Sequence, residues 1–347
     1  TNNNGAAVQF LDGVNNLLTT NGTLSSVNGI QGYAVAATGG NDSVVNNGHM
    51  IGNVDLGDGA NKLNIDGSGR YDSGATVIVG SGNALNNYGI LSPGGDDALL
   101  TTALTGNLVQ TSGGSYIVTL DGAQINVNDR VDVSGSADMS GTVQVSVIDA
   151  GTGTVQSQTT IVQANGGVSA ATAQNLTVTP SAVGNFGLVF SNTQKVDLTY
   201  AIDFSNAALS AGLNDNQEAV ADELDALHGQ GLIHRDLLYL LRAEDTGAYG
   251  EALDHLSPEP YAVSEWAAVL SSQQFNDALM SCRERSGDDR FIREGQCLRL
   301  GLQGRRFERD ASGDSTGYRL DSAEISLGAQ KALSEQWHLG FGLAYET

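Results

Sequence analysis

Three aspartates near the start of the chain have the residue type and surroundings of a calcium site. Asp42 lies in the stretch GGNDSVVNNG, while Asp58 and Asp66 lie in VDLGDGANKLNIDGSG. Gly-Gly-x-Gly-x-Asp nonapeptides bind calcium when they stack in tandem and share each ion between turns. The nonapeptide does not recur here. Because Asp and Asn also favour tight backbone corners, we predict no metal site, with calcium at these three aspartates as the alternative.

Histidine and serine do not form a recognisable catalytic pattern. Of the five histidines, only His49 precedes residue 200, so the strand-rich part of the chain offers a single histidine as a general base. Aspartate is plentiful, so a pair of carboxylates of the kind that cleaves glycosidic bonds stays open. We predict no catalytic residue and no cofactor, and an enzyme of the hydrolase or lyase class is the alternative. The other histidines are His228, His234, His255 and His338.

The composition favours many short strands joined by tight turns. Among 347 residues there are 45 glycines and only 4 prolines, and short runs of Val, Ile and Leu recur, which argues against disorder. The net charge of −23 makes nucleic acid a poor partner, because phosphates repel an acidic surface. No run of about 18 apolar residues occurs, so we predict no transmembrane helix. The chain starts without an export signal, and we expect a fragment of a longer protein.

Up to about residue 205 the chain alternates short apolar groups with Asn-Gly and Asn-Asn steps. Such groups occupy 21–24, 47–51 and 87–91. Their spacing is close to multiples of about 20 residues, the coil length of a stacked solenoid. Asn, Gly and Asp suit the corners of such coils. We therefore predict a mainly β protein with a right-handed parallel β-helix over 1–205, and a β-sandwich is the alternative.

Beyond residue 205 the apolar period becomes helical. Asn214 and Gln217 form a capping box, and Gly229 is a helix stop. Ser257 followed by proline is a strong helix start. We predict an α-helical linker over 206–283, with helices at 214–229, 232–241, 246–256 and 257–280.

Three stretches near the end, 297–307, 323–330 and 337–345, alternate strictly between apolar and polar or small residues. Alternation over about ten residues is typical of strands that cross an outer membrane. We therefore predict the first strands of an outer-membrane β-barrel over 284–347. Because an open sheet edge cannot persist in lipid, we expect the remaining strands downstream.

The order of these regions resembles the autotransporters of Gram-negative bacteria, which use type Va secretion. NNYGILSPGG and the strand-rich segment up to Val147 resemble the junction, or autochaperone, end of a passenger, which we place at about 86–205. LNDNQEAVADELDAL resembles the helical lead-in, and LRLGLQGRRFERD resembles the opening of the β-domain. The resemblance implies a barrel that anchors and translocates a β-helical passenger, with the linker helix inside the barrel and the passenger at the cell surface.

The resemblance also implies partners. They are outer-membrane lipid, the barrel assembly machinery, periplasmic chaperones and a host-cell or other surface receptor for the passenger. An adhesive passenger is the first expectation, with an enzyme on a β-helix or a structural spacer as alternatives. Gly301, Gly328, Gly340 and Gly342 occupy the polar side of the barrel strands. They either leave room for a helix or let the barrel bend.

Cys282 and Cys297 are the only cysteines, and they flank a charged segment between the last helix and the first barrel strand. The resemblance places them at the periplasmic rim, in an oxidising compartment. We predict a disulfide between them, with two free thiols as the alternative. It would close a loop of about 15 residues and add at most about 3 kcal/mol to stability.

Overall fold

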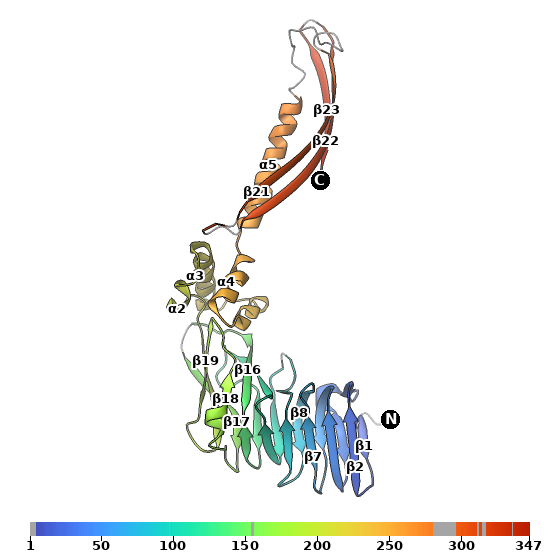
Figure 1. Ribbon diagram of the computed structural model, residues 1–347, viewed down its shortest axis with the longest axis vertical. Coiled ribbons are helices and arrows are strands. Elements are labelled where there is room, and N and C mark those ends of the chain that lie inside the picture. Colours follow the sequence, from blue (N-terminus) through green and yellow to red (C-terminus); the bar gives the residue numbers. More distant parts are fainter. Residues whose placement is uncertain are drawn as a thin grey trace. The chain divides into compact units, whose positions relative to one another are not determined.

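The computed structural model describes residues 5–96, 98–153, 156–279, 296–310, 312–313, 317–334 and 336–347. Strands hold 48% of the chain and helices 18%, so the prediction of a mainly β protein is confirmed. The chain divides into two compact units (Figure 1). The stacked-strand unit comprises 1–213 and 221–252, and the C-terminal unit comprises 214–220 and 253–347. The predicted boundaries at 205 and 283 stay predictions, and the second lies outside the described residues.

One sheet of the stacked-strand unit is a column of six short strands, each hydrogen-bonded in parallel to the next. Partner residues are from 19 (Ser43↔Lys62) to 29 (Leu108↔Ala137) positions apart. The spacing is thus wider and less regular than the sequence predicts, because the connecting loops differ in length. The strands are β2 (Asn15–Thr20), β5 (Asn41–Asn46), β7 (Lys62–Ile65), β9 (Ala84–Asn87), β12 (Asn107–Gln110) and β15 (Ala137–Met139).

The larger sheet holds two further parallel columns, which share the long strands β6 (His49–Asp55) and β8 (Arg70–Ile78). One column continues through β3 (Thr23–Ser25), β10 (Ile90–Pro93), β13 (Ser115–Asp121), β16 (Gly141–Asp149) and β18 (Leu176–Val178). The other continues through β1 (Val8–Phe10), β4 (Tyr33–Ala37), β11 (Thr101–Thr105), β14 (Arg130–Val133) and β17 (Ser157–Ala164). The pairing then becomes antiparallel, from β17 to β20 (Lys195–Ile202) and β19 (Gly184–Val189). Two short helices, η1 (Gly29–Gln31) and α1 (Thr172–Asn175), lie in the loops.

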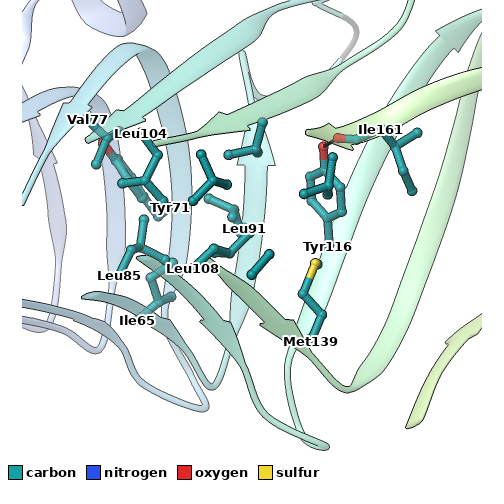
Figure 2. Close-up of a cluster of buried hydrophobic side chains, with 14 of the residues drawn as sticks. Ile65, Tyr71, Val77, Leu85, Leu91, Leu104, Leu108, Tyr116, Met139 and Ile161 are labelled. Carbon is teal, nitrogen blue, oxygen red and sulfur yellow. Dashed lines mark hydrogen bonds between the residues drawn. The ribbon is translucent and has the colours of Figure 1, made fainter. Parts of the chain in front are cut away.

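Matching registers stack apolar side chains into ladders inside this unit (Figure 2). In one ladder Tyr71 pairs with Leu91, and Leu91 with Tyr116. All three are buried, and the two hydroxyls donate to the carbonyls of Gly52 and Ile161, at 2.9 Å in each case. Each large apolar side chain that is removed from water in this way contributes roughly 2 kcal/mol of transfer free energy. The interior ladders therefore fix the register of the columns.

The bend in β6 depends on a buried asparagine and an adjacent glycine. The Asn53 side chain donates to the carbonyls of Gln31 and Gly32, at 2.9 and 3.1 Å, and accepts from the amide of Thr76 at 2.8 Å. Gly52 has φ +117°, and a Cβ there would lie 2.5 Å from the Gly32 carbonyl oxygen. The bend thus needs a glycine, and the amide side chain satisfies the backbone groups that the bend frees.

The helical region follows the predicted order with one correction. The capping box at α3 is confirmed, because the amide of Gln217 donates to the Asn214 side chain at 2.9 Å and the reverse bond is 3.0 Å. The predicted α-helix over 232–241 is instead the 3₁₀-helix η2 (Arg235–Arg242). Its buried Leu238 and Leu241 are three residues apart, which aligns them on a helix with three residues per turn. The other helices are α2 (Ala207–Ser210), α3 (Asp215–Gly229), α4 (Thr246–Asp254) and α5 (Glu259–Leu279).

The C-terminal unit contains a three-stranded antiparallel sheet that is curved like part of a barrel wall, with α5 running along it (Figure 1). Its strands are β21 (Cys297–Arg309), β22 (Tyr318–Ala332) and β23 (His338–Glu346), which confirms the three predicted strands and lengthens the first two. Of the described helices, none has the length and apolar character needed to span a membrane.

Candidate functional site: the two faces of the C-terminal sheet

One face of the C-terminal sheet is apolar and open. Leu300 pairs with Leu327, and Leu327 with Leu343, so that apolar side chains form rows across all three strands. Leu298, Leu300 and Leu302 are 70–76% exposed. Several large apolar side chains side by side in this state make a patch of a kind that soluble monomers rarely carry. We call this the apolar face, and its exposed members are Leu298, Leu300, Leu302, Ile325, Leu327, Leu339, Phe341, Leu343 and Tyr345.

The opposite face carries small residues beside polar and charged ones. Gly301 lies opposite Ser326, which lies opposite Ala344 on the next strand. Helix α5 contacts β22 and β23 of this unit. A Cβ added at Gly301 would lie 2.5 Å from the Ser326 hydroxyl, whereas Cβ atoms at Gly328 and Gly340 meet nothing closer than 3.7 Å. None of these Cβ positions has an atom of α5 among its nearest neighbours, so both predicted roles for these glycines stay predictions.

A charged cluster lies on this small-residue face. The Arg305 guanidinium binds Glu324 at 2.7 Å and Glu346 at 3.3 Å, and the Ser322 hydroxyl donates to Glu346 at 2.7 Å. Ser271 of α5 also hydrogen-bonds Glu346. The Arg305 and Glu324 side chains are only 8% and 9% exposed. The cluster therefore joins three strands and the helix through charge-assisted hydrogen bonds.

Sequence reasoning did not identify this cluster. Arg305, Glu324 and Glu346 are each unremarkable members of an alternating strand, and no local motif joins them. The signal that could have found them is the antiparallel register, which sets Arg305 opposite Ser322 and Glu324 opposite Glu346. Without a known register, one arginine and two glutamates far apart in the sequence predict only solvated side chains.

The predicted cysteines are described only in part. Cys297 opens β21, and its thiol is not free. Cys282 lies outside the described residues. The disulfide between them therefore stays a prediction.

The three candidate calcium ligands have different surroundings. Asp42 is buried in β5. Its carboxylate accepts from the Asn16 side chain at 2.7 Å, and its backbone amide donates to the Asn61 side chain. Asp58 is exposed in a loop, and Asp66 follows β7 at a corner, where its carbonyl accepts from the Gly69 amide. Among the described residues, no three His, Cys, Asp or Glu side chains are grouped so as to hold a metal ion. The structure therefore does not bring these aspartates together as a ligand set.

His49 takes part in an ion-pair network that the sequence did not predict. Its Nε2 lies 2.6 Å from the Asp72 carboxylate, which also accepts from Arg70 at 2.7 Å. Arg70 in turn binds Asp96 at 2.6 Å. Parallel pairing sets His49 beside Arg70 on adjacent strands. The network thus ties the loop after β10 to two strands of the stacked-strand unit.

One buried carboxylate of the stacked-strand unit has a shifted pKa. Asp129 is fully buried and accepts from the backbone amides of Leu100 and Thr119, at 2.8 Å each. Burial raises the pKa of Asp129 to about 7, and the two amides offset only part of that effect. The side chain therefore joins β13 to the segment before β11, and its charge depends on pH near neutrality.

Comparison with models of known families, with curated proteins and with solved structures finds no match to this chain.

Proposed function

We propose that this chain is part of an autotransporter of type V secretion, in which a barrel and its internal helix anchor and translocate a passenger to the cell surface. In this proposal β21–β23 are the first strands of an outer-membrane barrel, α5 passes through the barrel interior, and the stacked strands are a right-handed parallel β-helix. The observation that carries the proposal is the sheet with an open apolar face on one side and a helix-covered face of small and charged residues on the other.

The two faces have the chemistry that a barrel wall requires. The hydrocarbon core of a membrane offers no hydrogen-bond partners. A strand that spans it must therefore point apolar side chains toward the lipid and pair its polar side chains on the inner face. Nine exposed apolar residues meet the first need. The Arg305 cluster meets the second, because its charges are paired with one another and with α5. A soluble sheet of this size would instead cover its apolar face with a helix or a second sheet.

The passenger assignment is supported by the stacked-strand unit. Its three columns of parallel strands are what successive coils of a β-helix produce, whereas β-sandwiches are antiparallel. The antiparallel strands β19 and β20 end the columns on the side that leads into the helical region. For this passenger we propose an adhesive role, in keeping with the family resemblance. An enzymatic or purely structural passenger remains the alternative.

The membrane assignment is tested with two leucines that are equally exposed. Leu300 lies on the apolar face and Leu17 in the stacked-strand unit, and both are 70% exposed. An arginine facing the middle of a bilayer costs about 2–4 kcal/mol, whereas one facing water costs little. We expect Leu300→Arg to deplete the whole protein, produced in Gram-negative cells, from the outer-membrane fraction, and Leu17→Arg to leave its amount there unchanged.

Secretion is read in the same cells from an epitope placed in the loop between β7 and β8. Antibody binding and protease digestion of intact cells are expected for the wild type and Leu17→Arg, and are expected to be lost for Leu300→Arg. Wild-type protein found in the soluble fraction, or an epitope reached only after cell lysis, would overturn the proposal.

A further inference from the structure

The stacked-strand unit contains several Asn-Gly steps, in which an asparagine side chain can react with the backbone that follows it. The glycine amide nitrogen attacks the side-chain carbonyl, and glycine has no Cβ to hinder the approach. The attack needs a free amide nitrogen, so the fold decides which step reacts. Asn4-Gly5 begins outside the described residues. The described steps are Asn21-Gly22, Asn28-Gly29, Asn47-Gly48 and Asn165-Gly166.

Two of these steps are protected by backbone hydrogen bonds. The Gly29 amide donates to the Ser26 carbonyl at 3.0 Å. The Gly166 amide donates to the Gly135 carbonyl at 2.8 Å. A nitrogen that donates in this way must lose its hydrogen bond before it can attack a carbonyl, which slows the reaction.

The Asn47-Gly48 step is protected by a buried asparagine just before it. The Asn46 side chain is fully buried and accepts from the Gly48 amide at 3.1 Å. Asn87, which is also fully buried, accepts in the same way from the Gly89 amide at 3.2 Å. At both corners a buried asparagine two residues before the glycine thus occupies the glycine amide.

The Asn21-Gly22 step has a threonine in place of that asparagine. Thr20 pairs with Asn46 on the adjacent strand, so it takes the same position one coil earlier. Its hydroxyl donates to the Gly22 carbonyl at 3.4 Å, and within the described part of the chain the Gly22 amide has no acceptor. Asn21 and Gly22 are both exposed, and beyond its chain neighbours no atom lies within 4 Å of a Cβ placed on Gly22. The nitrogen of this step is therefore free to react.

The side chain of Asn21 has one partner, in the next coil. The Asn47 side-chain amide donates to the Asn21 Oδ1 at 2.9 Å. An exposed hydrogen bond of this kind offers little resistance to rotation of the side chain. While it lasts, it also stabilises the negative charge that develops on this oxygen during the attack.

We propose that Asn21 is a site of spontaneous modification, at which asparagine converts to isoaspartate and aspartate. The Gly22 nitrogen gives its proton to water or hydroxide and forms a bond to the side-chain carbon of Asn21. The side-chain nitrogen takes up a proton from water and leaves as ammonia. Water then opens the resulting five-membered imide at one of its two carbonyls, which gives isoaspartate or aspartate. This inference does not rest on the proposed secretion function.

The modification alters the start of the stacked strands. It places a carboxylate beside the Asn47 side chain, and isoaspartate also lengthens the main chain by one carbon. This change comes directly before β3, where Thr23 pairs with His49 of β6. We therefore expect faster amide exchange in β3 of aged protein than in fresh protein.

The test incubates the whole 347-residue chain at neutral pH, folded in detergent or unfolded in guanidinium, in water labelled with heavy oxygen. Peptide mapping by mass spectrometry then follows loss of the side-chain amide and uptake of the label at each step. In guanidinium we expect the four described steps to react at similar rates. In the folded protein we expect Asn21 to react about tenfold faster than Asn47, because the Gly48 amide must first lose its hydrogen bond.

Thr20→Asn tests the cause, because it offers the Gly22 amide the acceptor that Asn46 offers Gly48. We expect it to slow the reaction of Asn21 about five- to tenfold in the folded protein and to leave the rate in guanidinium unchanged. Thr19→Asn, on the exposed side of β2, is the matched control and is expected to react like the wild type. An unmodified Asn21, equal rates at Asn21 and Asn47 in the folded protein, or an unchanged rate in Thr20→Asn would each overturn the proposal.

Discussion

In β7 of the stacked-strand unit, Leu63 and Ile65 alternate with polar residues and are fully buried. In β21 of the C-terminal unit, Leu298 and Leu300 also alternate with other residues, yet both are 70% exposed. The period is the same and the outcome is opposite. In the first unit, columns of strands on several sides enclose the apolar ladders, whereas in the second unit no described element forms a layer over the apolar face of the sheet.

Alternation of apolar and polar residues therefore indicates only that a strand has two different faces. Which face meets water, lipid or protein depends on what lies beside the sheet. In the C-terminal unit the small and charged face has α5 as its partner, so the apolar face remains for another environment. The hydrophobic effect then favours transfer of that face out of water, at about 25 cal/mol per Å².

The largest effect is expected where a charge enters the interior of the stacked strands. Val143 is fully buried between Tyr116 and Val178 in its ladder. We expect Val143→Asp to lower the free energy of unfolding by more than about 4 kcal/mol, because a buried carboxylate has no partner there. Hydrogen exchange of the amides of β13 and β16 measures this effect.

Gln144→Asp is the matched control, since its side chain lies on the opposite, exposed side of the same strand. It is expected to leave exchange nearly unchanged. If the proposed function holds, Val143→Asp also stalls passenger display without blocking insertion of the barrel. Equal exchange rates in Val143→Asp and the wild type would contradict the arrangement of the ladder.

A somewhat smaller effect is expected in the charged cluster of the C-terminal unit. Removal of Arg305 leaves Glu324 buried without its cation, and such unpaired charges cost about 3–5 kcal/mol. We therefore expect Arg305→Ala to lower the thermal midpoint of this unit clearly, as measured by the fluorescence of Trp266 and Trp337. Arg306→Ala is the control, because that side chain is 57% exposed, and it is expected to change little.

A second substitution distinguishes charge imbalance from lost packing. Arg305→Met combined with Glu324→Gln removes both members of the closest pair and retains most of their volume. Because replacing a whole buried pair is often nearly neutral, we expect this double variant to recover much of the stability that Arg305→Ala loses. A double variant as unstable as Arg305→Ala would mean that packing, not charge pairing, holds this part of the sheet.

The features that sequence analysis predicted well are those that neighbouring residues determine. The capping box of Asn214 and Gln217 lies within one helical turn, and the three C-terminal strands follow from alternation within each strand. The period-2 pattern also placed Gly301 on the side that faces α5. These predictions needed no knowledge of which segments pair with one another.

The features that it missed depend on register. Asp72 contacts His49 only because β6 and β8 are adjacent with a particular alignment, and loops of unequal length set that alignment. The 3₁₀ geometry of η2 was missed because the spacing of its leucines is compatible with an α-helix as well.

The last effect, which is spread over several pH units, concerns the way each unit holds a buried charge. The C-terminal unit pairs Arg305 with carboxylates, whereas in the stacked-strand unit Asp129 is held by backbone amides, and its pKa is raised from 3.8 to about 7. The folded state therefore binds the proton more tightly than the unfolded state. This contribution to stability is complete below pH 4 and is lost as the pH rises toward 7, by at most about 1.4 kcal/mol per pH unit.

We expect Asp129→Asn to remove this dependence of stability on pH. The measurement is amide exchange of β13 and β14 between pH 5 and 7, compared between wild type and variant. Tyr71→Phe is the control, because it loses the hydrogen bond to Gly52 and is expected to cost about 1 kcal/mol at every pH alike. A difference between wild type and Asp129→Asn that does not change with pH would contradict the raised pKa. The contrast between an amide-held and an ion-paired buried charge would then no longer separate the two units.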